Sequence, residues 1–130
     1  MKKVSRAIIV NNEGKILLGK RVAGTAAGLY ALIGGKPDED ESAVDAVIRE
    51  VKEEVGLDFE ATPYLEKFDR SVGPDDPWMN YYFVGPAKGK LKLDPAEIES
   101  VIYVSRNELD KVNIAFDHKE ILAEYFQSLQ

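Results

Sequence analysis

The order of apolar and polar positions along the chain distinguishes its expected strands from its expected helices. Two runs rich in aliphatic residues, 4–10 and 15–20, flank the tetrapeptide Asn-Asn-Glu-Gly at 11–14. Asn and Gly tolerate the positive φ angles of a tight turn. We therefore expect the two runs to form a β-hairpin.

A short apolar segment follows a stretch of small residues. Residues 23–28 read Ala-Gly-Thr-Ala-Ala-Gly, and residues 29–35 then form an apolar run that ends in Gly34 and Gly35. Small residues and glycine favour turns, whereas the apolar run has the length of a strand. We expect one strand here, with the glycine pair at its end.

Helical spacing begins after this glycine pair and an acidic loop. Ser42 is a suitable N-cap residue, with Asp45 three positions later, and Gly56 is a stop signal. Because β-branched residues lower intrinsic helix propensity, we expect this helix to depend on packing against a sheet. Five residues at i, i+3, i+4, i+7 and i+11 form its predicted apolar stripe, and they are Val44, Val47, Ile48, Val51 and Val55.

Three runs in the second half of the chain are typical of strands. They contain β-branched and aromatic residues and lie at 61–72, 78–85 and 101–105. Residues 73–77 read Gly-Pro-Asp-Asp-Pro, which is the composition of a loop between the first two runs.

Two capping boxes predict helical segments near the end of the chain. Ser105 is followed by Glu108, and Asp117 is followed by Glu120, which indicates a short helical turn and a final helix over 118–129. Strands on both sides of the first helix, together with this final helix, favour an α/β sandwich. The length of 130 residues and the absence of a repeat or linker indicate a single domain over 1–130.

Composition excludes several kinds of site. The chain has no cysteine, which excludes disulfides and thiolate metal sites, and one histidine, His118, which we expect at the surface or linked to a helix cap and not in catalysis. Any metal should therefore be a hard cation held by oxygen. No apolar run approaches the length of a membrane span and no signal peptide is recognisable, so we expect a cytoplasmic protein without membrane contact.

Negative charge is concentrated in one part of the chain. The net charge is −6, and ten of the 23 acidic residues lie between Asp38 and Glu60. A surface that binds a nucleic-acid duplex requires the opposite sign, so we expect no such partner. An anionic small molecule remains a suitable ligand where a divalent cation reverses the local field.

Three glutamates stand out on the first expected helix. At about 100° per residue, Glu50, Glu53 and Glu54 fall within an arc of about 100°, away from the apolar stripe. Such an arc forms either a solvated acidic face or part of a metal site. A calcium-binding EF-hand loop does not fit residues 38–42, because alternating ligands and a mid-loop glycine are missing.

The surroundings of these glutamates decide between the two interpretations. From Gly35 the chain reads G-x5-E-x7-R-E-V-x-E-E-x-G-L, and its defined residues are Gly35, Glu41, Arg49, Glu50, Val51, Glu53, Glu54, Gly56 and Leu57. This segment resembles the Nudix box, the signature of hydrolases that act on a nucleoside diphosphate linked to another moiety. The likeness extends to the neighbouring strands and the final helix. Tyr30 and Ile33 differ from the Trp and Pro often found there in the family.

The resemblance implies a Nudix-type α/β/α sandwich with a mixed central sheet, a catalytic loop-helix and a C-terminal helix. It also implies a site for Mg²⁺, with Mn²⁺ as a substitute, formed by Glu50, Glu53, Glu54 and the carbonyl of Gly35. Glu50 and Glu54 lie one turn apart, and Mg²⁺ binds carboxylate and phosphate oxygens together. We expected Gly35 to permit a sharp turn of the backbone.

The resemblance assigns roles to further charged residues. Arg49 and Glu41 would form a bidentate pair that orients the loop before the helix. Family members often take another carboxylate from the loop before the last strand, and here either Glu97 or Glu99 would supply it.

Residues outside the box are candidates for substrate binding. Trp78, Asn80 and Phe116 carry aromatic faces or an amide edge that suit a nucleobase, but for Phe116 we expect packing in the core ahead of base binding. Lys20 and Arg21 end the second expected strand and could meet phosphate oxygens.

These features together predict an enzyme. We expect an Mg²⁺-dependent pyrophosphohydrolase of the MutT-like branch that cleaves a ribo- or deoxyribonucleoside triphosphate, oxidised ones included, to the monophosphate and pyrophosphate. Many ADP-ribose hydrolases of the family add an N-terminal dimerising segment, whereas this chain begins with its first strand. The alternatives are an ADP-ribose or nucleotide-sugar pyrophosphatase and a catalytically silent nucleotide sensor. A monomer and a homodimer fit equally.

Overall fold

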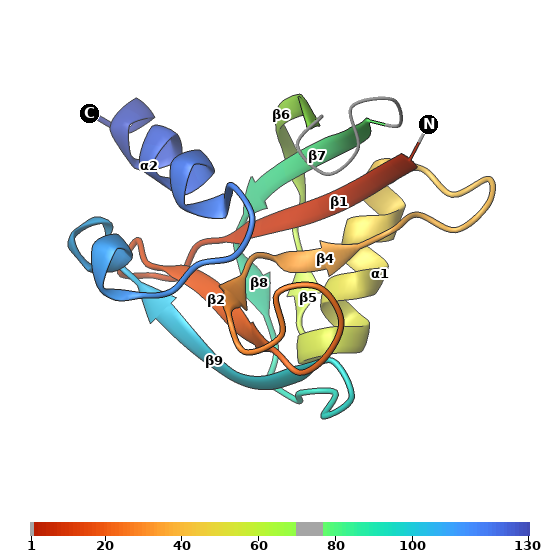
Figure 1. Cartoon of the computed structure of the whole chain (residues 1–130), viewed down its shortest axis with the longest axis horizontal. Coiled ribbons are helices and arrows are strands. Elements are labelled where there is room, and N and C mark those ends of the chain that lie inside the picture. Colours follow the sequence, from red (N-terminus) through yellow and green to blue (C-terminus); the bar gives the residue numbers. More distant parts are fainter. Residues whose placement is uncertain (1, 70–76) are drawn as a thin grey trace.

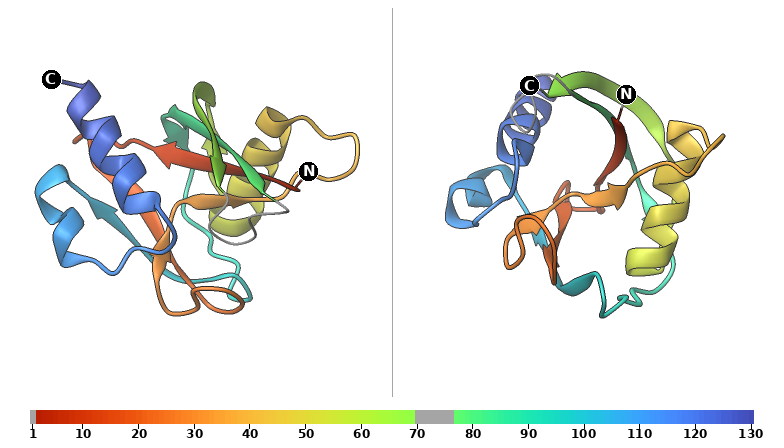
Figure 2. Two further views of the ribbon diagram at one scale, coloured as in Figure 1. Left: turned by 45° about the horizontal axis from the view of Figure 1, so that its top comes forward. Right: turned by 45° about the vertical axis from the view of Figure 1, so that its right-hand side comes forward.

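Two helices pack on opposite sides of the strands. The computed structural model describes residues 2–69 and 77–130. In Figures 1 and 2, α1 (Ala43–Val55) and α2 (His118–Ser128) lie on either side of the strands, and the 3₁₀ helix η1 (Arg106–Lys111) precedes α2. The strands are β1 (Lys2–Ile9), β2 (Ile16–Arg21), β3 (Tyr30–Ala31), β4 (Ile33–Gly35), β5 (Asp58–Phe59), β6 (Thr62–Asp69), β7 (Trp78–Gly85), β8 (Ala87–Lys88) and β9 (Ile98–Val104).

Hydrogen bonding divides these strands into one mixed sheet, one antiparallel sheet and a short ribbon. The mixed sheet has the order β4-β1-β7-β6, with β1 parallel to β7 and the other pairs antiparallel. The antiparallel sheet has the order β3-β2-β9, and β5 pairs with β8. The predicted α/β sandwich with a mixed sheet between helices is confirmed.

The pairing predicted for the first two strands is wrong. The turn is present, with the Asn11 amide donating to the Lys15 carbonyl at 2.9 Å. An isolated bridge then joins Val10 to Ile16, after which β1 and β2 enter different sheets. Both strands are buried along most of their length, so each needs neighbours and cover that a two-stranded hairpin cannot supply.

The apolar run at 29–35 forms two short strands and not one. β3 pairs with β2 and β4 pairs with β1, so the chain passes from one sheet to the other at Leu32. The Leu32 amide donates to Nδ1 of the buried His118 at 3.1 Å. Burial, together with the positive charges of Arg6 and Arg21, lowers the pKa of His118 well below 6.5. His118 is therefore a buried, neutral hydrogen-bond acceptor, and the expectation of a surface position was wrong.

Strand β1 separates two apolar cores. Ala7 and Ile9 face the core that α1 covers, whereas Ile8 faces the core that α2 covers. The hydroxyl of the fully buried Ser5 donates to the Ala43 carbonyl at 2.8 Å, which attaches the start of α1 to the same strand. β1 thus positions both helices.

The buried face of α1 is rotated from the predicted stripe. Val47, Val51 and Val55 are fully buried, but Ile48 is 39% exposed. Glu54 lies on the buried face. The prediction for Ile48 was wrong because α1 packs with the side that carries Glu54 against the sheet.

The helix ends follow the predictions in three cases of four. Ser42 and Gly56 cap α1, and Ser105 forms its capping box. Asp117 precedes α2 without a side-chain cap. Its carboxylate instead accepts from Lys67 Nζ at 3.1 Å and from the Tyr82 hydroxyl at 3.3 Å, two groups of the mixed sheet.

The predicted strands of the second half are present as β6, β7 and β9. Most of the expected loop at 73–77 lies outside the described residues. β9 begins at Ile98, earlier than predicted, so Glu99 lies within a strand. Within residues 2–69 and 77–130, neither helix combines the length and apolar character needed to cross a membrane.

The neutral state of His118 predicts a pH dependence of stability. Its pKa is lower in the folded chain than the ordinary 6.5, so below that pH the unfolded chain binds the extra proton. The free energy of unfolding should then fall by up to about 1.4 kcal/mol per pH unit. Urea unfolding of wild type and His118→Gln between pH 7.5 and 5.5 measures this, because the difference cancels other titrating groups. Equal slopes for the two proteins would contradict it.

Candidate active site

The guanidinium of Arg49 connects the loop before α1 to the helix. Its Nε and Nη2 donate to the two carboxylate oxygens of Glu41 at 2.9 Å each, which is the predicted bidentate pair. Nη1 donates to Glu50 at 3.0 Å and to Glu53 at 3.1 Å, and Nη2 also donates to the Lys36 carbonyl at 3.2 Å. One cation therefore holds three carboxylates and one backbone carbonyl.

These bonds affect the ionisation of both partners. Hydrogen bonds from Arg49 and from the Asp38 amide lower the pKa of Glu41 to about 2, and the bond to Glu41 raises the pKa of Arg49. Both groups are therefore fully charged at neutral pH, and the loop is fastened by an ion pair.

Gly35 lies directly beneath the Glu50 carboxylate. A Cβ atom at Gly35 would come within 2.5 Å of Glu50 Cδ, so any other residue would displace the carboxylate. The φ angle of Gly35 is not in the left-handed region, so the observed need for glycine at this position is space for the carboxylate. Gly34 allows the close approach of β4 to β1, because its Cβ would lie 1.9 Å from the Ser5 carbonyl oxygen.

Glu54 is the buried member of the glutamate cluster. Its side chain is 8% exposed, and its Oε2 has no hydrogen-bond partner. Burial raises the pKa of Glu54 to about 9, the nearby Glu50 adds to the shift, and Arg6 opposes it. Without a cation, Glu54 therefore keeps its proton at neutral pH. Glu53 is different, because its carboxylate is 55% exposed at the edge of the cluster.

This arrangement fits a hard divalent cation. The available ligand atoms of the glutamates are all oxygen, Gly35 lies against the Glu50 carboxylate, and Oε2 of Glu54 has no hydrogen-bond partner in the protein. Among the described residues, no three acidic or histidine side chains converge as a complete metal cage. Mg²⁺ suits such a partial set, since it commonly retains waters and takes the remaining ligands from substrate phosphates.

The structure distinguishes Glu97 from Glu99. The loop before β9 is attached to the end of α1, since the Asp94 amide donates to the Glu54 carbonyl at 2.9 Å. The negative charge of Glu97, in this loop, contributes to the raised pKa of Glu54. Glu99 instead forms an ion pair with Lys20 at 3.2 Å. Lys20, a candidate contact for the substrate phosphates, is therefore already paired. Glu97 is therefore the better candidate for the additional carboxylate.

Arg6 is a charged neighbour of this cluster that the sequence reasoning missed. It lies on β1, opposite Gly34 on one side and Tyr82 on the other. Its guanidinium packs 5.4 Å from the centre of the Phe116 ring, and Arg21 lies 5.2 Å from the same centre. The sequence contained a signal for this position of Arg6. Val4 and Ile8, two residues away on either side, are buried, and residues two apart on a strand share one face.

The predicted base-binding residues fall at two places. Phe116 is 43% exposed, so the expected core packing was wrong, and its ring lies with Arg21 near the start of α2. Asn80 is buried on β7, where its Nδ2 donates to the Lys67 carbonyl at 3.4 Å. Asn80 and Tyr82 are two residues apart on β7 and therefore share one face of the mixed sheet.

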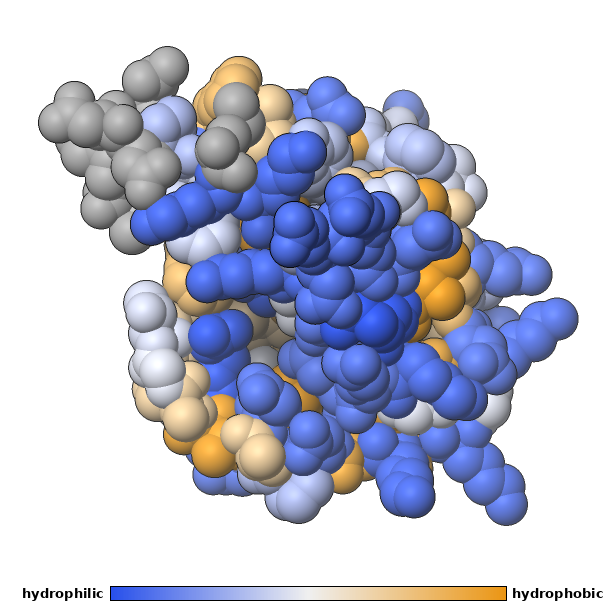
Figure 3. Space-filling model, turned by 90° about the vertical axis from the view of Figure 1, so that its right-hand side faces the viewer, coloured by the Kyte–Doolittle hydropathy of each residue, from blue (hydrophilic) through white to orange (hydrophobic). Residues whose placement is uncertain are grey.

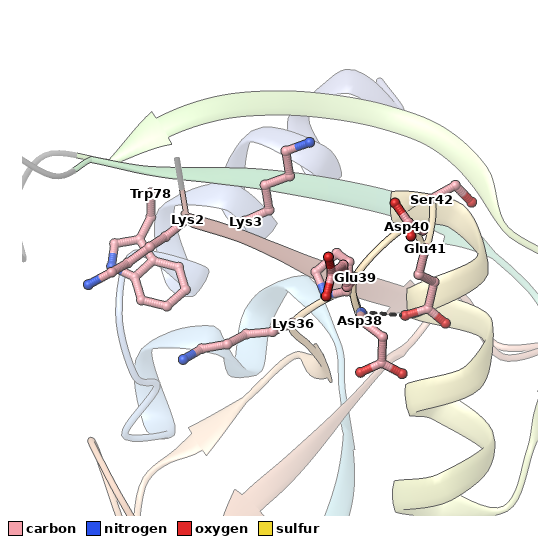
Figure 4. A pocket seen from close by; sticks show the side chains of 10 residues that line it. Lys2, Lys3, Lys36, Asp38, Glu39, Asp40, Glu41, Ser42 and Trp78 are labelled. Atoms are coloured by element: carbon pink, nitrogen blue, oxygen red, sulfur yellow. Dashed lines mark hydrogen bonds between the residues drawn. The ribbon is translucent and has the colours of Figure 1, made fainter.

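Trp78 is the first residue of β7, two positions before Asn80. Lys2 and Lys36 place their ammonium groups 5.5 and 4.9 Å from the centre of its ring. Figure 4 shows these side chains at one end of a groove of about 710 Å³, with the acidic loop 38–42 at the other end. Figure 3 views the side of the molecule on which α1 lies and shows that hydrophilic residues cover most of it.

Removal of the Arg49 side chain should loosen the site and the fold together. Arg49→Ala leaves several carboxylates without a cation, and we expect the melting temperature to fall by about 5 °C. Lys52→Ala is the control, because its bond to Asp58 is exposed and should change the melting temperature by about 1 °C or less. A wild-type melting curve for Arg49→Ala would contradict the bracing role.

The chain has recognisable relatives in sequence. A family model described as the NUDIX domain matches residues 1–125. Over 103 residues the chain is 40% identical to the CTP pyrophosphohydrolase of Escherichia coli (strain K12), which covers 78% of this chain and 75% of that protein. Over 126 residues it is 33% identical to the ADP-ribose pyrophosphatase of Methanocaldococcus jannaschii, which covers 92% of this chain and 70% of that protein.

The fold also has solved counterparts. The solution structure of the E. coli ORF135 protein matches with a TM-score of 0.79 and 29% identity, covering 99% of this chain and 90% of that one. The Arg49–Glu41 pair and the glutamate cluster over Gly35 lie within the segment that the family model matches. The chain belongs to the NUDIX family.

Proposed function

We propose that this chain is an Mg²⁺-dependent pyrophosphohydrolase that cleaves a nucleoside triphosphate to the monophosphate and pyrophosphate, with CTP and dCTP as its first candidates. The observation that carries the proposal is the buried Glu54, which has an unpartnered oxygen and interacts with Glu50, the residue that lies against Gly35. A buried carboxylate without a partner is costly, and a cation offsets that cost. The 40% identity to a CTP pyrophosphohydrolase supports the choice of base.

The residues of the cluster would divide the work between them. Glu50, Glu54 and the Gly35 carbonyl would hold the cation, with Glu97 close enough to add negative charge. When bound, Mg²⁺ would offset phosphate charge and lower the pKa of a coordinated water. Arg49 keeps Glu50 in place, and the exposed Glu53 stands where it could accept a proton from the attacking water.

The substrate's base would lie on the face of the mixed sheet near the start of α2. Phe116 offers an exposed aromatic surface there, and Asp117 and Lys67 offer an acceptor and a donor. Paired donors and acceptors at fixed positions discriminate between base edges, because a wrong base leaves them unpaired.

ADP-ribose is the second candidate substrate. It is favoured by the 33% identity to an ADP-ribose pyrophosphatase over nearly the whole chain. The groove beside Trp78 could bind the second moiety of such a substrate. It offers an aromatic ring and the ammonium groups of Lys2 and Lys36.

A substrate screen with phosphate detection separates these candidates. We expect hydrolysis of CTP or dCTP in millimolar Mg²⁺ to exceed that of dGTP, 8-oxo-dGTP and diadenosine polyphosphates, with little turnover of ADP-ribose. EDTA should abolish the activity. Turnover of ADP-ribose alone would overturn the triphosphate proposal, and tight binding without turnover would indicate a silent sensor.

Replacement of Glu54 should separate activity from stability. Glu54→Gln keeps the shape, and turnover should fall by about two to four orders of magnitude. The metal-free protein should keep or raise its melting temperature, because a buried ionisable group is removed. Steady-state kinetics at several Mg²⁺ concentrations and a melting curve on the same sample test both. A folded variant that keeps more than about a tenth of wild-type turnover would show that Glu54 is not a principal ligand.

A further inference from the structure

Arg6 is held between the glutamate cluster and the face expected to bind the base. On β1 it lies opposite Gly34, whose missing side chain lets β4 approach the β1 backbone closely at this point. Glu54 and Glu50 attract its guanidinium electrostatically, whereas the nearby Arg21 repels it. Arg6 is thus a cation that interacts with the glutamate cluster while its guanidinium packs against Phe116.

The hydrogen bonds of Arg6 are incomplete. Nη1 donates to the Leu32 carbonyl at 3.2 Å, but Nε is buried and has no partner. Burial and the neighbouring Arg21 lower the pKa of Arg6 to about 10. An unpartnered buried donor and two adjacent cations both cost stability, so this position is poorly explained by folding alone.

Glu54 also has a buried atom without a hydrogen-bond partner, in this case an acceptor. Among the described residues, Glu54 Oε2 and Arg6 Nε are the two buried side-chain polar atoms without a hydrogen-bond partner. One is an acceptor suited to a cation, and the other is a donor suited to an anion. A phosphate that shares a cation with Glu54 and accepts from Arg6 would satisfy both atoms at once.

We propose that Arg6 binds the phosphate nearest the nucleoside and so positions the substrate between the metal ligands and the base face. This phosphate is the only group of a nucleoside triphosphate that joins its base-bearing part to its pyrophosphate. The inference rests on the proposed function. It adds to the family motif a substrate contact from β1, outside the box.

The role of Phe116 follows from this placement. Its ring covers Arg6 and Arg21 from the exposed side, and its backbone has φ 57°, a conformation that is unfavourable for a residue with a side chain. The ring excludes water from the guanidinium, which strengthens a bond between Arg6 and a phosphate. A movement of this exposed ring would give the ligand access to Nε.

The test compares nucleoside monophosphates with their nucleosides. Calorimetry with CMP, GMP and AMP, and with cytidine, guanosine and adenosine, in Mg²⁺ gives the gain in affinity that the phosphate provides. We expect Arg6→Met to reduce this gain at least tenfold for the base that binds best, with nucleoside affinity changed less than about threefold. For Arg6→Lys the affinity gain from the phosphate should lie between those of wild type and Arg6→Met, because lysine keeps the charge and loses the planar guanidinium.

Two controls separate ligand binding from a structural role. Arg106→Met removes an exposed arginine on η1 and should leave the phosphate gain unchanged. The metal-free melting temperature of Arg6→Met should not fall, because an incompletely bonded buried cation is removed. A lower melting temperature with an unchanged phosphate gain would show that Arg6 only supports Leu32 and Phe116.

The two proposals fail in different ways. A wild-type protein that binds no monophosphate more tightly than its nucleoside, or an Arg6→Met variant with an undiminished gain, would overturn the role of Arg6. Hydrolysis of CTP by that same wild-type sample would leave the proposed function intact. Conversely, a wild-type protein that hydrolyses no nucleotide of the screen would overturn the proposed function, and the binding ratio would still test Arg6.

Discussion

The site depends on one guanidinium. Arg49 binds Glu41 in the loop and Glu50 and Glu53 on the helix, so it sets the distance between the two segments and offsets part of their negative charge. Without it, acidic side chains would be crowded together and the loop would have no ionic attachment to α1. The position of Glu50 above Gly35, and the approach of Gly35 to the helix, both follow from this attachment.

Local spacing explains why much of the site was predictable from sequence. The order of Glu41, Arg49 and Glu50 along a loop and a helix fixes their separation, whatever the rest of the chain does. Ser42 and Gly56 marked the ends of α1 for the same reason. The space that Gly35 leaves for the Glu50 carboxylate was not predicted, because it depends on how the helix packs against β4.

Long-range packing explains what the sequence did not reveal. The adjacent runs that make β1 and β2 have the pattern of a hairpin, yet each finds better cover in its own sheet. The exposure of Ile48 depends on how α1 is rotated about its axis. The spacing of apolar residues along the helix does not fix this rotation, because the packing against the sheet sets it. Arg6 and Glu97 approach Glu54 only after strands and loops distant in sequence have assembled.

The parallel pairing of β1 with β7 also constrains how the chain acquires its structure. Lys2 lies opposite Trp78, and Ile9 lies opposite Gly85, so more than half of the chain separates the two central strands. Such contacts close long loops before they contribute stability, which slows folding. During synthesis on the ribosome, β1 has no β7 to pair with until that later segment has emerged. Its apolar faces and free edge are then open to other chains or to chaperones, and the finished sheet removes this exposure by placing β1 in its interior.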